Sequence, residues 1–248
     1  MNAFFRYLTI QFKMDLRDRG FLLSFYMMPL IFFAVMGAVF SSINPQMKTT
    51  LAATMTIFAA TMGAVMGSPT PLVHLRESGT LRAFRVNGIP TSAVLSVHSV
   101  STFLHLFLVS CVIYVLSPVL FHSQVPQSPP LYFAAAAAFL FASVGVGMLI
   151  GSCARGQSQA TVISMLVFMP SILFSGIMFP SSMLPEPFLW LGRIIPATYA
   201  LQSFYGLAYR MQTDLDGLLS LAAVLGFGIL TFLLAAWRFR QIGETEQI

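Results

Sequence analysis

The side chains best suited to metal binding or nucleophilic chemistry are four histidines and two cysteines. They are His74, His98, His105, His122, Cys111 and Cys153. The histidines are divided between loops and one apolar segment, without the grouped carboxylate or thiolate partners of a metal motif. The chain also has no GxSxG nucleophile elbow and no GxxxxGK[ST] phosphate-binding loop. The sequence therefore predicts no catalytic residue, no metal site and no cofactor-binding site, so the chain by itself is not expected to be an enzyme.

His98, Thr102 and His105 stand four and three residues apart, so a helix would carry all three on one face. Such a face would suit a polar path for a substrate. The alternative is that these side chains are satisfied against neighbouring helices. No Asp, Glu, Lys or Arg stands inside any long apolar segment, which disfavours a transporter driven by protons or ions.

The composition indicates that lipid surrounds most of the chain. Of the 248 residues, 57% are hydrophobic and 8% are charged, against about 25% charged in an average soluble domain. Because even folded soluble proteins must cover themselves with polar atoms, we expect an all-α polytopic membrane protein. The net charge of +5 is spread thinly, so no nucleic-acid partner is predicted, and the opening residues lack the continuous apolar core of a signal peptide.

Six apolar segments are long enough to cross a bilayer, since about 20 apolar residues span its hydrocarbon core. They are residues 21–41, 51–73, 92–119, 131–152, 160–179 and 218–237, within a single transmembrane domain over 1–248. With the N-terminus inside, ten of the thirteen Lys and Arg residues fall on the inner side. Both termini are therefore predicted to be cytoplasmic.

Three segments outside the spans have their own patterns. Residues 1–20 predict an amphipathic helix at the inner membrane surface, although Asp15 and Arg19 interrupt its apolar arc; the alternative is a short cytoplasmic lead-in. Residues 76–90 suit either a short helix parallel to the membrane or a solvated linker. Residues 180–212 contain several prolines and are strongly apolar, which predicts a helical hairpin dipping into the outer leaflet.

Two groups of short motifs resemble the ABC-type 2 exporter permeases, which include drug, polysaccharide and lipid exporters. The stretch from Arg76 to Arg82, RESGTLR, is similar to the family's R-E-x-G-T-L-[ER] sequence after the second span. Ser175 to Pro180, SGIMFP, and Ile195 to Ala200, IPATYA, match its series between the fifth and sixth spans. In this order, around six spans, the motifs cover the whole chain.

The resemblance implies roles for individual residues. The loop 76–90 resembles the coupling helix that docks on an ATPase, which assigns ATPase coupling to Arg76, Glu77, Gly79, Thr80, Leu81, Arg82, Phe84 and Arg85. Residues 180–212 resemble the paired outer re-entrant helices, which assigns an outer gate to Phe174, Phe179 and Pro180. His98, Thr102 and His105 remain the candidate substrate path.

The function implied is that of a permease subunit that exports an amphiphilic drug, lipid or glycan across the plasma or inner membrane. Two copies of a separate ABC ATPase subunit would bind ATP and Mg²⁺, and a second permease copy or a paralogue would complete the complex in the lipid bilayer. A non-transporting membrane scaffold or assembly factor with the same fold is the alternative.

Overall fold

The computed structural model describes residues 3–43, 48–179 and 183–245, and these residues form helices and connecting loops without a β-strand. The elements in chain order are α1 (Ala3–Arg17), α2 (Arg19–Leu22), the π-helical turn η1 (Leu23–Met27), α3 (Met28–Ile43), α5 (Leu51–Thr61), the π-helical turn η2 (Met62–Gly67), α6 (Pro69–Glu77), α7 (Thr80–Val86), α8 (Thr91–Phe121), α9 (Pro129–Cys153), α10 (Gln157–Phe174), α11 (Glu186–Gly192), α12 (Pro196–Ser203), the π-helical turn η4 (Phe204–Ala208) and α13 (Gly217–Thr245).

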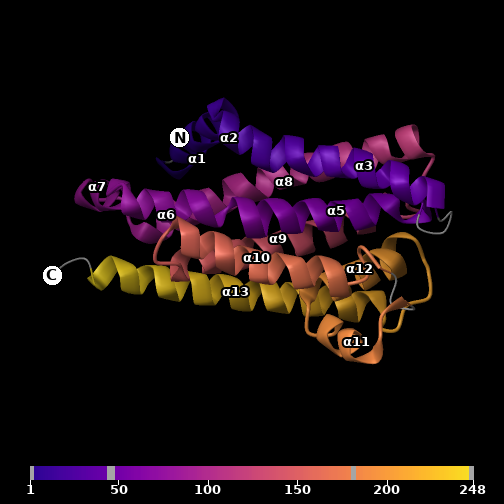
Figure 1. Ribbon diagram of the computed structural model, residues 1–248. Helices are drawn as coiled ribbons and strands as arrows, with labels where there is room; N and C mark the ends of the chain where they lie inside the picture. Colours follow the sequence, from indigo (N-terminus) through magenta and orange to yellow (C-terminus); the bar gives the residue numbers. More distant parts are fainter. Residues whose placement is uncertain (1–2, 44–47, 180–182, 246–248) are drawn as a thin grey trace.

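Six continuous helical segments of the described chain are long and apolar enough to cross a membrane, which confirms the all-α polytopic fold. They are Arg19–Phe40, Leu51–Glu77, Thr91–Phe121, Pro129–Cys153, Gln157–Phe174 and Gly217–Gln241. The segments lie side by side as one elongated bundle (Figure 1).

Most ends of these segments lie within a few residues of the ranges expected from hydropathy, and two of the differences have a clear local cause. The second segment runs past Pro69 and Pro71 to Glu77, because the two prolines stand in the first turn of α6, where they interrupt no helical hydrogen bond. The fifth segment ends at Phe174 instead of Phe179. Gly176 follows with a φ of 92°, a left-handed conformation that stops the helix at little cost for glycine.

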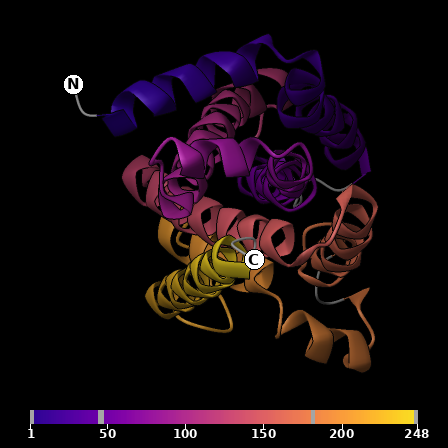
Figure 2. The same cartoon turned by 90° about the vertical axis from the view of Figure 1, so that its left-hand side faces the viewer.

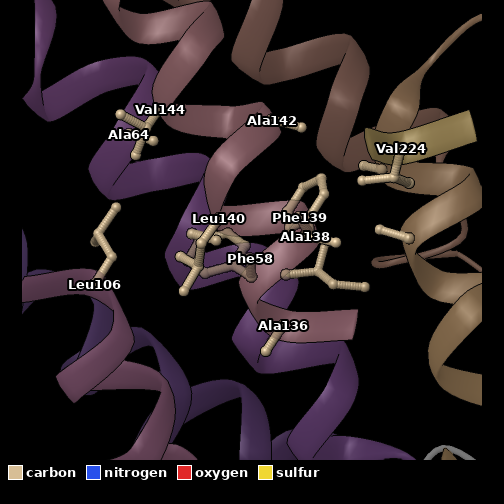
Figure 3. Packing of buried hydrophobic residues seen from close by; sticks show 14 of the residues in the cluster. Phe58, Ala64, Leu106, Ala136, Ala138, Phe139, Leu140, Ala142, Val144 and Val224 are labelled. Carbon is tan, nitrogen blue, oxygen red and sulfur yellow. The ribbon is translucent and has the colours of Figure 1, made fainter. Parts of the chain in front are cut away.

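The core of the bundle lies around the second and fourth segments. Every residue of α5 is buried, and α9 packs along both α5 and α13. Figure 3 shows Phe58 of α5 beside Phe139 and Leu140 of α9. Glycines let these helices approach closely: a Cβ on Gly147 of α9 would collide with the backbone of Ala64. Small residues at such crossings thus serve packing within the chain.

The two ends of the bundle carry different elements. The N-terminal helix α1, the short helix α7 and the C-terminal end of α13 lie at one end (Figure 1). The short helices α11 and α12 lie at the other. Viewed from the first end, α1 runs across the top of the bundle and α13 lies at its lower side (Figure 2). Each end of the bundle therefore carries shorter helices outside the six long segments.

Candidate functional site

The short helix α7 is framed by two glycines in left-handed conformations. Gly79, with a φ of 72°, precedes its first residue Thr80, and Gly88, with a φ of 78°, follows its last turn. A side chain at either position would strain the backbone, so the sequence fixes where α7 begins and ends. The hydroxyls of Ser78 and Thr80 share a hydrogen bond of 2.8 Å across the turn between α6 and α7.

Arg76 fastens the end of α6 to the connection between α9 and α10. Its guanidinium donates hydrogen bonds to the carbonyl oxygens of Ser152 (3.3 Å) and Ala154 (2.6 Å). The neighbouring Glu77 accepts a hydrogen bond of 3.2 Å from Gln157, the first residue of α10. Bidentate guanidinium contacts hold geometry well, so Arg76 and Glu77 tie the base of α7 to the loop that starts the fifth segment.

Two apolar residues of α7 face the protein itself. Leu81 is buried, with 1% of its surface exposed. The half-buried ring of Phe84 packs against Tyr7 of α1, with 5.5 Å between ring centroids. Arg85 is also half-buried. These contacts fix the orientation of α7 against the bundle and against α1.

The opposite face of α7 is open. Arg82 and Ala83 are exposed, and Val86 has 82% of its surface exposed, the highest value among the large exposed hydrophobic side chains. This face is therefore open to contact with another surface. Of the eight predicted coupling residues, Arg76, Glu77, Leu81 and Phe84 hold α7 in place, and Arg82 lies on its exposed face. Val86, which was not among the eight, lies on the same exposed face.

His105 lies in a buried polar cluster that links α1 to α8. Its Nε2 is 3.5 Å from a carboxylate oxygen of Asp15, and its Nδ1 shares a hydrogen bond of 2.6 Å with the hydroxyl of Tyr26. Ser101 donates a 2.6 Å hydrogen bond to Asp15, and the Phe12 ring stacks on His105 with 4.1 Å between centroids. Asp15 is thus an anchor of α1 on the bundle.

Sequence reasoning missed this role of Asp15, which it treated as a defect in the apolar arc of α1. Although burial by itself would raise the pKa of the Asp15 carboxyl, hydrogen bonds from His105, Ser101 and Gln11 outweigh it and lower that pKa. Burial, helped by the nearby Asp15 charge, raises the pKa of Tyr7. Two features of the sequence could have indicated this role. Asp15 interrupts an otherwise apolar helix face, and the third apolar segment contains His98 and His105 without an acidic partner of its own.

His98 and Thr102 are buried as well, with 5% and 2% of their surfaces exposed. They stand on α8 with His105, as their spacing predicts. The hydrogen bond of His105 with Tyr26 is a contact within the bundle, and a substrate path along these three residues stays a prediction.

The predicted outer-gate residues lie at the opposite end of the bundle. The Phe174 ring stacks on Phe188 of α11, with 5.0 Å between centroids, and joins the fifth segment to α11. Phe179 has 44% of its surface exposed. Pro180 lies outside the described residues.

The fold and this site define a class: a multi-pass α-helical membrane protein with a short helix held rigidly at one end of its bundle. The profile of the ABC-2 type transporter family matches residues 2–209, and the chain belongs to this family. Membership of this family indicates the membrane component of a transporter. The chain is also similar to the ABC transporter G family member 20 of Dictyostelium discoideum, with 25% identity over 167 residues. That match covers 67% of this chain and 23% of the relative, so the chain spans less than a quarter of the relative's length.

Proposed function

We propose that the chain is the permease subunit of an ATP-driven exporter that moves an amphiphilic drug, lipid or glycan out of the cell. ATP would be hydrolysed on two copies of a separate ATPase subunit, and a second permease copy or a paralogue would complete the translocation pathway. The end of the bundle that carries α7 and both termini would face the cytoplasm, in the plasma or inner membrane.

The geometry of α7 is the observation that carries this proposal. A permease without an ATP site would be driven through contacts with its ATPase. The position and contacts of α7 suit that role. Its outer face offers Arg82 and Val86 to a partner, while Arg76 and Glu77 tie its base to the start of α10. Movement of α7 would therefore reach the second and fifth segments together.

The opposite end supplies the outer parts of the pathway. The short helices α11 and α12 would re-enter the outer leaflet while packed against protein, since irregular backbone cannot face lipid. Phe174, stacked on Phe188, would close the path between transport events as an apolar gate. This gate would open when the fifth segment moves.

Copurification and ATP hydrolysis test this function. The tagged chain should bring down a stoichiometric ATPase, and the reconstituted complex should hydrolyse ATP faster with one of three substrate classes, namely drugs, lipids or glycans. Replacing Arg82 by Glu and Val86 by Asp together should remove the ATPase while the bundle still inserts. A chain that never binds an ATPase would contradict the permease function and favour a scaffold.

A further inference from the structure

A groove of about 640 Å³ opens between α8 and α13 in the half of the bundle nearer α7. Its size falls within the range of about 300–1,000 Å³ that is usual for small-molecule sites. The α8 wall carries side chains at spacings of three and four, which is one helix face, and the α13 wall repeats this pattern. The lining residues include Ser92, Val100 and Phe103 of α8 and Ile229, Phe232 and Arg240 of α13.

The floor of the groove is fixed by close packing between α9 and α13. Phe141 of α9 stacks on Phe232 with 4.6 Å between ring centroids, and both line the groove. A Cβ on Gly228 would come within 2.7 Å of the Phe141 ring, so glycine is needed at this crossing. The groove is thus a preformed feature between rigid helices.

The groove is apolar along its length and polar at one end. Val100 and Ile229 are exposed on facing walls, with 36% and 53% of their surfaces accessible. Ser92, at the start of α8, and Arg240, near the end of α13, both stand at the end of the bundle that carries α7. In the described part of the chain, the Ser92 hydroxyl has no hydrogen-bond partner, so it is available to a ligand.

We propose that this groove binds an anionic phospholipid of the inner leaflet, with its acyl chains along the apolar walls and its phosphate at Arg240 and Ser92. The orientation of the groove rests on the proposed function, which puts α7 on the cytoplasmic side. A guanidinium pairs well with a phosphate, and basic pockets between membrane helices on the cytoplasmic side bind anionic headgroups. An apolar occupant with an anionic end matches both the lining and its charge.

The test measures the lipids bound to the full chain in detergent by native mass spectrometry, with phosphatidylglycerol and phosphatidylcholine as probes. The wild-type chain should prefer phosphatidylglycerol by about fivefold or more, the effect expected of one cation near a headgroup of net negative charge. Phosphatidylcholine has the same phosphate, but its choline cation offsets that charge. Arg240→Gln should abolish that preference. Arg238→Gln is the matched control, because Arg238 is exposed on the same helix, donates to Gln241 and does not line the groove.

Variants that fill the groove complete the test. Val100→Trp, or Ile229→Trp from the opposite wall if the first does not fold, should reduce binding of both lipids. Equal loss in the Arg238 and Arg240 variants would overturn the proposal, because general positive charge would then explain the preference. Displacement of phosphatidylglycerol by inorganic phosphate would overturn it too, because the site would then hold a free anion. Lipid binding needs no ATPase, so this result and the test of the permease function can fail independently.

Discussion

Removing the Asp15 carboxylate should release α1 from the bundle. In the structure Asp15 accepts hydrogen bonds from Gln11 (2.8 Å) and Ser101 (2.6 Å) and lies 3.5 Å from Nε2 of His105. Asp15→Ala would leave the Ser101 hydroxyl and the His105 nitrogen without this partner. These two residues are 1% and 0% exposed, so both are shielded from bulk water in the wild-type structure.

Each buried polar group that loses its partner costs about 1–3 kcal/mol. With two such groups, and with the desolvation of the carboxylate relieved, we expect α1 docking to weaken by about 2–4 kcal/mol. Since α1 lies at the edge of the bundle, this loss should appear as local opening. Amide hydrogen exchange in α1 should accelerate by about 30- to 1,000-fold, while exchange in α9 stays unchanged.

Asp18→Ala is the matched control for this experiment. Asp18 is an exposed acidic residue just after α1, and its carboxylate accepts a 2.8 Å hydrogen bond from the Gly20 amide as the cap of α2. Loss of a cap costs about 1 kcal/mol, so the acceleration should stay near fivefold. If the Asp15 variant exchanged no faster than the Asp18 variant, the polar cluster would not anchor α1.

Further changes probe the charge of the cluster, the base of α7, the outer gate and the orientation. The stabilisation from Asp15 should be complete above the pKa of an unfolded aspartate, about 3.8, and should be lost as the pH falls through its lower folded pKa. The exchange difference between wild type and Asp15→Ala should therefore persist at pH 5 and shrink as the pH falls below about 3.8. Arg76→Ala should lower the free energy of unfolding by about 1.5–3 kcal/mol, measured as a lower melting temperature, because two buried carbonyls lose a charged donor. Arg82→Ala is the control: Arg82 is exposed, so this change should alter stability by less than about 0.5 kcal/mol. Phe174→Ala should raise basal leak or uncoupled ATP hydrolysis in the reconstituted complex with assembly intact, and lower expression alone would favour a packing role. A cysteine at Gln127 should react with an impermeant reagent from outside sealed cells and a cysteine at Arg82 should not; labelling of position 82 would reverse the orientation.

The fold followed from patterns that are independent of distant contacts. Segment length and hydropathy depend only on local composition, which is why all six membrane segments were found. For residues 76–90 the sequence left a short helix and a solvated linker as alternatives, and the structure has the helix α7 from Thr80 to Val86 between Gly79 and Gly88.

The roles of single residues depended on contacts between segments, and the sequence could not supply these. Leu81 and Phe84 were expected to face an ATPase, yet Leu81 is buried in the bundle and Phe84 packs on Tyr7 of α1. The exposed Val86 was overlooked for the same reason, since apolar residues in a short helix do not reveal which of them the rest of the chain covers. Asp15 and His105 are far apart in sequence, and only the packing of α1 on α8 makes them partners.

The contact between the outer face of α7 and an ATPase is the central claim, and cross-linking tests it most directly. In a chain whose native Cys111 and Cys153 are replaced by serine, Val86→Cys should form a cross-link to the copurified ATPase. The reagent is a short heterobifunctional linker whose maleimide alkylates the introduced thiol and whose active ester acylates a lysine amine of the ATPase. Trp190→Cys is the control, because it is similarly exposed but lies on α11 at the opposite end of the bundle. A cross-link at position 86 and none at 190 is the predicted result; an ATPase that copurifies and cross-links only at position 190, or at neither position, would contradict the account.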